Sequence, residues 1–168
     1  MEAEIAGIFR KKKKTLGIAE SCTGGLVSHR ITNVQGSSRY FKGGFIAYSD
    51  EVKMSVLSVP REMIRKHGAV SRQVARAMAE GVRRVLRTDC AASVTGIAGP
   101  GGGTPEKPVG LAYISVASGS RTRTRKVLCK GDRAAVKYAF SQAVLGFIRE
   151  VARGNEQNKK FYRDRVPG

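Results

Sequence analysis

The stretch that decides the fold is IAESCTGG, which runs from Ile18 to Gly25. Its apolar start predicts a short buried strand, and its hydroxyl residues and paired glycines predict a turn into a helix capped by Thr23. Such a turn can place Ser21 beside backbone N–H groups at the helix start, where a nucleophile and an oxyanion are both accommodated. A serine at a strand–helix turn is as often a plain helix cap, so both interpretations stay open.

Strand and helix patterns alternate on both sides of this stretch. Strands are expected over residues 15–21, 41–49, 90–95, 109–118 and 121–129. Helices are expected over residues 2–13, 23–34, 50–57, 61–66, 71–87 and 132–152. Asp50, Ser71 and Asp132 are the expected caps of three of these helices, and Gly43-Gly44 allows a close backbone approach or a bulge. The alternation with one late hairpin predicts an α/β fold, a three-layer α/β/α sandwich around a mixed sheet.

The length and composition predict one compact domain. With 168 residues, 41% of them hydrophobic, the chain can bury a sizeable core over residues 1–152, followed by a basic, partly frayed tail over residues 153–168. No run approaches the roughly 18 to 20 apolar residues of a membrane span, and no secretory signal is expected. Cys22, Cys90 and Cys129 are odd in number and widely spaced, which indicates reduced thiols in a cytoplasmic protein.

The net charge of +18, from 31 Lys and Arg against 13 Asp and Glu, is unusual. Such a surplus attracts polyanions and phosphorylated ligands, but a generally basic surface is the favoured explanation. Arg121, Arg123 and Arg125 alternate on an expected strand and should share one face, where they could contact a nucleic-acid backbone. Few aromatic residues are interleaved with the charges, which weighs against a nucleic-acid partner.

A nucleophilic serine needs a base, and the sequence favours Lys53 with Tyr48. Tyr48 closes the second expected strand, and Lys53 falls in the first turn of the next helix. A separation of five residues across this strand–helix junction can point the side chains of Tyr48 and Lys53 into the same crevice. Burial, neighbouring cations and the helix dipole would favour the neutral amine that a base requires. The alternatives are a solvated lysine and a tyrosine at the edge of the core.

Other catalytic and metal-binding sets are not evident. His29 falls within an expected helix and His67 precedes a glycine at a helix end, so neither completes a Ser-His-Asp set. There is no Cys-x-x-Cys, no paired histidine and no carboxylate cluster, and we therefore expect no metal site.

A glycine-rich segment, TGIAGPGGGT from Thr95 to Thr104, follows the most apolar expected strand. Open α/β sheets bind ligands at the carboxyl ends of their strands, and glycines there expose N–H groups to phosphate or carboxylate oxygens. The pattern matches neither the P-loop nor the dinucleotide fingerprint, and a flexible surface loop is the alternative. Arg133, at a helix start, suits a bidentate anion contact or a surface salt bridge. The candidate substrate contacts are Thr23, Gly24, Gly25, Thr95, Gly96, Gly99, Gly101, Gly102 and Arg133.

Several segments, in one order over roughly residues 2–152, resemble the CinA C-terminal domain family, the nicotinamide-nucleotide amidohydrolases. They read AESCTGG (19–25), GSS (36–38), YS (48–49) with Lys53, HGAVS (67–71), TGIAGPGG (95–102), KPVG (107–110) and GDR (131–133). In many relatives this domain follows a larger one that resembles molybdopterin-binding proteins, and we expect the stand-alone form here.

The resemblance implies hydrolysis of the carboxamide of nicotinamide mononucleotide, with release of ammonia, in cytoplasmic pyridine-nucleotide salvage. By position, Ser21 would be the nucleophile, Lys53 the general base and Tyr48 a partner in proton transfer, while Thr95 and Arg133 would contact the substrate. The resemblance also implies an α/β/α sandwich, no cofactor and a homo-oligomer. The alternatives are a catalytically silent nucleotide-binding domain and a nucleic-acid-associated protein.

Overall fold

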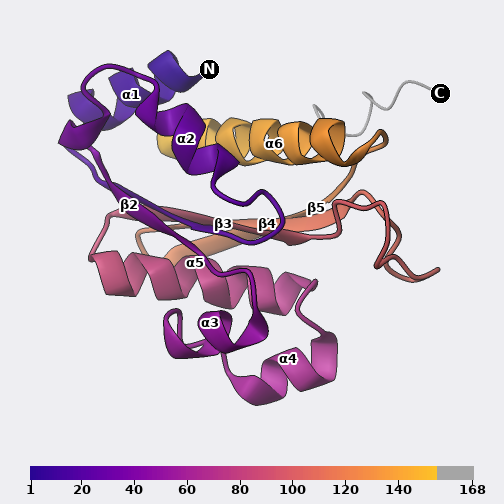
Figure 1. Cartoon of the computed structure of the whole chain (residues 1–168). Helices are drawn as coiled ribbons and strands as arrows, with labels where there is room; N and C mark the ends of the chain where they lie inside the picture. The colour runs from indigo at the N-terminus through magenta and orange to yellow at the C-terminus, as the bar shows by residue number, and fades with distance from the viewer. Residues whose placement is uncertain (155–168) are drawn as a thin grey trace.

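The computed structural model describes residues 1–154, which form one mixed five-stranded sheet between two helical layers (Figure 1). The strands are β1 (Leu16–Glu20), β2 (Phe41–Ile46), β3 (Cys90–Gly96), β4 (Leu111–Ser118) and β5 (Arg121–Leu128). The helices are α1 (Glu2–Lys11), α2 (Leu26–Thr32), α3 (Asp50–Ser55), α4 (Arg61–His67), α5 (Arg72–Leu86) and α6 (Arg133–Arg153), with a 3-10 turn over Ser37–Arg39.

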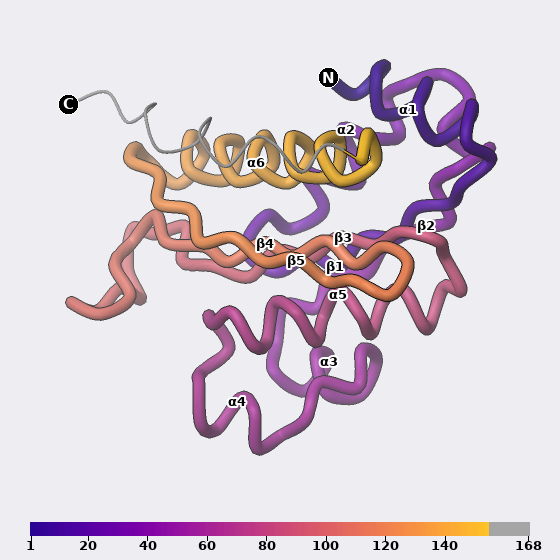
Figure 2. The backbone as a smooth tube through the Cα atoms, turned by 180° about the vertical axis from the view of Figure 1, so that it is seen from behind, coloured from indigo at the N-terminus to yellow at the C-terminus, as the bar shows by residue number. Residues whose placement is uncertain are grey.

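The strand order is β2-β1-β3-β4-β5, with β1, β2 and β3 parallel and β4 antiparallel to both of its neighbours. Helices α1, α2 and α6 cover one face of the sheet, and α3, α4 and α5 lie on the other (Figure 1). Seen from behind, the β4–β5 hairpin lies between α6 and α5 (Figure 2). The α/β fold with three layers, expected from the sequence, is confirmed.

The topology positions a site at one edge of the sheet. The chain leaves β1 for α2 on one face, whereas it leaves β2 for α3 on the other, so the two connections diverge beyond the carboxyl ends of neighbouring parallel strands. Ligands in open α/β sheets bind in the crevice at such a divergence. The glycine-rich loop after β3 and the start of α6 lie at this same edge, on the right of Figure 1.

Apolar side chains fill both faces of the sheet. Phe9 of α1, Ile18 of β1, Val116 of β4 and Phe147 of α6 belong to the core under the first layer. Val74, Met78 and Val82 of α5 pack with Leu57 and Ala91 in the core of the second layer. Strand β3 supplies residues to both cores, as its continuous apolar pattern predicts. A side chain at Gly44 would come within 3.0 Å of the Ile18 carbonyl oxygen, which confirms the close backbone approach expected there.

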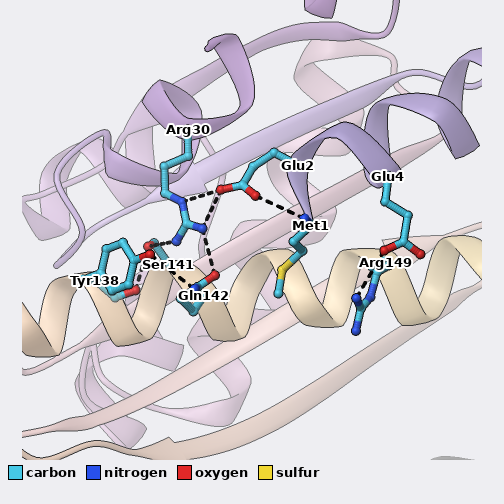
Figure 3. Close-up of polar contacts among 8 residues, drawn as sticks. All are labelled: Met1, Glu2, Glu4, Arg30, Tyr138, Ser141, Gln142 and Arg149. Carbon is cyan, nitrogen blue, oxygen red and sulfur yellow. Dashed lines mark hydrogen bonds and ion pairs between the residues drawn. The ribbon is translucent and has the colours of Figure 1, made fainter. Parts of the chain in front are cut away.

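Polar contacts centred on Arg30 join the helices of the first layer (Figure 3). Its guanidinium donates to Glu2 Oε1 of α1 (2.8 Å from Nε) and to Ser141 Oγ and Gln142 Oε1 of α6, both at 2.7 Å. It also lies 4.9 Å from the centre of the Tyr138 ring. Because Arg30 is on α2, this network fixes the helix that follows the predicted nucleophile.

Two expected helix caps are wrong. Thr23 does not cap α2, because its hydroxyl donates to the carboxylate of Glu20 (2.7 Å) and the helix begins only after Gly25, whose φ is +96°. Asp50 does not cap α3, because the Ser49 hydroxyl accepts from the Val52 N–H at 3.3 Å. The N-cap of α2 is Gly25, without a side-chain cap, whereas α3 is capped by the residue before the expected one.

Two other expected helix caps are confirmed. Ser71 caps α5 and Asp132 caps α6, as predicted. Val85 of α5 is 44% exposed, although the neighbouring Leu86 packs against the core. The predicted basic tail over residues 153–168 lies outside the described residues from residue 155 onward. No helix of the described chain is long and apolar enough to span a membrane.

Candidate active site

A cleft of about 280 Å³ lies at the carboxyl ends of β1 and β3. It combines residues from the turn after β1, the segment after β2, the turn before α5, the glycine-rich loop and the start of α6. The lining residues are Ser21, Cys22, Tyr48, Asp50, Lys53, Ala69, Val70, Thr95, Gly96, Ile97, Ala98, Gly99, Gly101, Gly102 and Arg133. Segments far apart in the sequence therefore meet where the topology predicts a ligand.

Glu20, at the end of β1, holds the turn that carries Ser21. Its buried carboxylate accepts five hydrogen bonds. The Thr23 hydroxyl and the N–H groups of Gly25 and Val27 donate to Oε2, while the Ser28 N–H and hydroxyl donate to Oε1, all at 2.7–3.0 Å. The negative charge also sits at the positive end of α2, where it is stabilised.

The Glu20 contacts correct the expected oxyanion site. The N–H groups at the start of α2 are bound by Glu20 and are not available to a substrate. The N–H groups of Cys22, Ala98 and Gly99 are in the lining of the cleft and donate to no other residue of the described chain. These three N–H groups are among the donors of the cleft that remain for a developing negative charge.

Ser21 is positioned by the sheet rather than by its own side chain. Its N–H donates to the Val94 carbonyl of β3 at 3.1 Å, which continues the parallel pairing of β1 and β3 by one residue. Its hydroxyl makes no hydrogen bond to any other described residue, and the side chain lines the cleft. The hydroxyl is therefore fixed in place by the backbone yet remains available to react.

Lys53 is a buried cation, 2% exposed, in the wall of the cleft. Its Nζ donates to the carbonyls of Tyr48 (3.0 Å) and Ser49 (3.3 Å) and to the Asp50 carboxylate (3.3 Å). An ammonium has three N–H donors, and three oxygens satisfy all of them. Any action of Lys53 as a base requires that one of these protons first leave.

Tyr48 and Arg133 meet at the mouth of the cleft. The Arg133 guanidinium donates from Nη2 to the Tyr48 hydroxyl (3.2 Å) and from Nη1 to the Gly99 carbonyl (2.5 Å). It thereby joins the start of α6 to the segment after β2 and to the glycine-rich loop. The surface salt bridge considered for Arg133 is not formed with any described carboxylate.

The glycine-rich loop is tied to the second helical layer at two points. The Thr95 hydroxyl, at the end of β3, donates to the Ala69 carbonyl at 3.0 Å. Lys107 donates to the His67 carbonyl at the end of α4, at 2.7 Å. These contacts fix the position of the loop relative to the second helical layer. Thr95 itself is one of the residues that line the cleft.

Electrostatics distinguish Ser21 from its neighbour Cys22. Burial raises the pKa of the Cys22 thiol to about 12, and the Glu20 carboxylate adds to the rise, while Lys137 and Arg133 oppose it. The thiol is therefore protonated near neutral pH and is a poor nucleophile. All three cysteines are free, as expected from their spacing. Among residues 1–154, no three His, Cys, Asp or Glu side chains gather closely enough to hold a metal ion.

Most of the predicted site residues meet in the cleft. Ser21, Tyr48, Lys53, Thr95, Gly96, Gly99, Gly101, Gly102 and Arg133 all line it. Thr23, Gly24 and Gly25 do not, because the Thr23 hydroxyl and the Gly25 N–H bind Glu20. Sequence reasoning missed Glu20, although an acidic residue at a strand end just before a glycine-rich helix start signals this role. It also missed Asp50 as the partner of Lys53.

One of the three arginines considered for nucleic-acid contact, Arg125, binds side chains of the protein itself. Arg125 of β5 lies 4.1 Å from the centre of the Phe147 ring and is paired with Glu150, both on α6. The alternation of β5 therefore turns this arginine toward the first helical layer, where it stabilises the packing of α6.

A comparison with known protein families identifies one that matches almost the whole described chain. The model of the CinA C-terminal domain matches residues 1–152. The chain belongs to the CinA C-terminal domain family. The resemblance seen in the sequence motifs is confirmed.

Curated CinA relatives are similar over most of this chain. A CinA-like protein of Dictyoglomus thermophilum is 48% identical over 149 residues, 89% of this chain and 36% of that protein. A competence-damage inducible protein of Halothermothrix orenii, described as putative, is 49% identical over 146 residues, 86% of this chain and 35% of that protein. The chain thus spans little more than a third of the length of these relatives.

Solved structures of CinA proteins share the fold. A competence/damage inducible protein from Agrobacterium tumefaciens has a TM-score of 0.85 at 34% identity, covering 92% of this chain and 95% of that one. A CinA superfamily protein from Klebsiella pneumoniae has a TM-score of 0.88 at 26% identity, covering 92% and 96%.

Proposed function

We propose that this domain hydrolyses the carboxamide of nicotinamide mononucleotide to the carboxylate and ammonia. The observation that carries the proposal is the convergence of Ser21, Tyr48 and Lys53 on one cleft at the carboxyl ends of parallel strands. Membership of the CinA family supports it, because an amidohydrolase is what the family motifs imply.

The proposed reaction has two steps. Ser21 Oγ attacks the carboxamide carbon and loses its proton, the carbon–nitrogen bond breaks, and ammonia leaves with the proton that Ser21 gave up. Water then attacks the resulting ester, one proton of the water restores the serine hydroxyl, and the acid so formed leaves as the carboxylate and gives its proton to the released ammonia or the solvent. No oxidant, reductant or metal enters the balance.

Lys53 is the proposed proton acceptor, directly or through Tyr48. Its Nζ is held by three oxygens, and it must give up one proton before it can accept the proton of Ser21. The same contacts fix the amine in the wall of the cleft, which limits the entropy lost when the substrate binds. A general base in this position contributes roughly 10²- to 10⁴-fold to the rate.

The proposed oxyanion donors are the N–H groups of Cys22, Ala98 and Gly99. Cys22 lies in the turn after β1, and Ala98 and Gly99 lie in the loop after the neighbouring strand β3. No described residue accepts a hydrogen bond from these three N–H groups. One well-aimed donor of this kind is typically worth about 3 kcal/mol in the transition state. Arg133 and the glycine-rich loop would hold the phosphorylated end of the substrate.

Ammonia release tests this function. The wild-type protein should release ammonia from nicotinamide mononucleotide, and Ser21→Ala should abolish the release while keeping the fold and the affinity for the nucleotide. Cys22→Ala is the matched control, because it removes the neighbouring thiol, keeps the backbone N–H proposed as an oxyanion donor, and should remain active. Absence of ammonia from nicotinamide mononucleotide, other pyridine nucleotides and free nicotinamide would contradict the proposal.

A catalytically silent nucleotide-binding domain is the second candidate. The observation that favours it is the complete satisfaction of Lys53 Nζ by three oxygens, which is how a structural ammonium is bound. Calorimetry would identify it by binding of the mononucleotide without turnover in the wild-type protein.

A further inference from the structure

Lys137 lies one helical turn after Arg133 on α6, and the two cations share a second hollow. This hollow of about 400 Å³ is lined by Leu26, Arg133, Ala134 and Lys137. Arg133 also lines the cleft that holds Ser21, so the hollow and the cleft share this residue. The hollow is therefore a neighbouring subsite for a ligand whose reactive end lies at Ser21.

The ammonium of Lys137 forms no hydrogen bond or ion pair with the described residues, although Lys137 is half-buried. Asp132 accepts from the Ala135 N–H and Glu20 accepts five hydrogen bonds, and neither carboxylate forms an ion pair with Lys137. Like charges four positions apart on a helix destabilise it. The pair of cations is therefore a local cost to the fold that an anion between them would offset.

Lys137 also reaches the turn that carries the nucleophile. A methyl group added at Gly24 would stand 3.5 Å from Lys137 Nζ. The charges of Lys137 and Arg133 both act on the Cys22 thiol, the residue after Ser21. Lys137 therefore lies beside the turn that carries Ser21.

We propose that Lys137 and Arg133 together bind the phosphate dianion of the mononucleotide substrate. Arg133 still has N–H donors beyond the two that contact Tyr48 and Gly99, and Lys137 contributes a point charge with three donors. A phosphate monoester carries a charge of about −1.5 to −2 at pH 7, which two cations neutralise. This inference rests on the proposed function and makes the domain selective for phosphorylated over unphosphorylated nucleosides.

Calorimetry in a Ser21→Ala background separates binding from turnover. The probes are nicotinamide mononucleotide and nicotinamide riboside, which differ only in the phosphate. Lys137→Gln should weaken mononucleotide binding about tenfold, the size expected for one lost charge-assisted contact, and leave riboside binding unchanged. Lys137→Arg should retain most of the affinity. Lys11→Gln is the matched control, since it removes the same charge from α1, away from the hollow, and should change neither affinity.

Three results would overturn the assignment. These are unchanged mononucleotide affinity in Lys137→Gln, an equal loss for both probes, and no binding of the mononucleotide at all. Thermal melting of each variant verifies that the fold is intact. If the wild-type protein releases no ammonia but the binding pattern holds, the proposed hydrolysis fails and the phosphate site stands.

Discussion

The Arg133 guanidinium donates a hydrogen bond to the Tyr48 hydroxyl across 3.2 Å, joining the start of α6 to the segment after β2. The same guanidinium donates to the Gly99 carbonyl. One exposed side chain thus fixes two walls of the cleft relative to each other and orients the phenol that borders it.

Tyr48→Phe should lower kcat for ammonia release by roughly 10²-fold if the phenol carries the proton between Ser21 and Lys53. If the phenol only orients Arg133, the variant should instead raise KM and leave kcat nearly unchanged. Steady-state kinetics with nicotinamide mononucleotide distinguish the two. Tyr138→Phe, which alters an exposed phenol on α6 outside the cleft, is the control.

Lys53→Met should reduce ammonia release by roughly 10²- to 10⁴-fold, because it removes the proposed base. It should also lower the free energy of unfolding by about 2 kcal/mol, since three oxygens lose their donor. Full activity of Lys53→Met at neutral pH would rule out the base assignment.

Cys22 should resist alkylation in the native protein at pH 8. Burial raises the pKa of its thiol to about 12, so little thiolate exists at that pH, and burial does the same for Cys90. Both should react with iodoacetamide only after unfolding in urea, whereas Cys129, which is less buried, should react first. Peptide mass spectrometry after timed labelling measures the order, and rapid native labelling of Cys22 would contradict it.

Arg30→Met should lower the free energy of unfolding by about 2–3 kcal/mol, because it removes the contacts that join α2 to α1 and α6 (Figure 3). Arg65→Met is the matched control. Its ion pair with Glu62 is exposed, and its loss should cost less than about 0.5 kcal/mol. Urea unfolding of both variants gives the comparison, and equal effects would contradict a special role for Arg30.

The Arg30 network should also depend on pH. Burial alone would raise the pKa of Glu2, but the hydrogen bond and charge of Arg30 outweigh it, so the pKa lies below its ordinary value of 4.5. Glu2 therefore contributes stability above about pH 4.5, and this contribution is lost as pH falls through the lower folded-state value. Glu2→Gln should be less stable than the wild type at pH 7, and the difference should shrink in acid.

Much of this fold follows from local patterns. The apolar strand β3 and the helix capped by Ser71 are where the sequence predicts them, because burial on both faces and a cap before an amphipathic stripe leave clear signals. Thr23 and Asp50 were misassigned as caps for a tertiary reason. The carboxylate of Glu20 takes the Thr23 hydroxyl, and among adjacent polar residues only the folded geometry selects Ser49 over Asp50.

The candidate site was predictable as a set of segments but not as a network. Strand ends and glycines identified the loops that carry Ser21, Lys53 and Arg133, since parallel strands bring their carboxyl ends together. No spacing rule indicates that Lys53 would be buried on three oxygens or that Lys137 would approach Gly24. Those contacts depend on how α3 and α6 pack against the sheet.

The most direct test of the central claim is the mass of the peptide containing Ser21 after acid quench of a reaction with nicotinamide mononucleotide. We expect an ester that carries the acyl mononucleotide on Ser21, forming as ammonia is released and decaying as the carboxylate appears. Ser21→Ala should form no such ester and release no ammonia. Wild-type rates of ammonia release from Ser21→Ala, or an acyl group on Cys22 in place of Ser21, would contradict the claim.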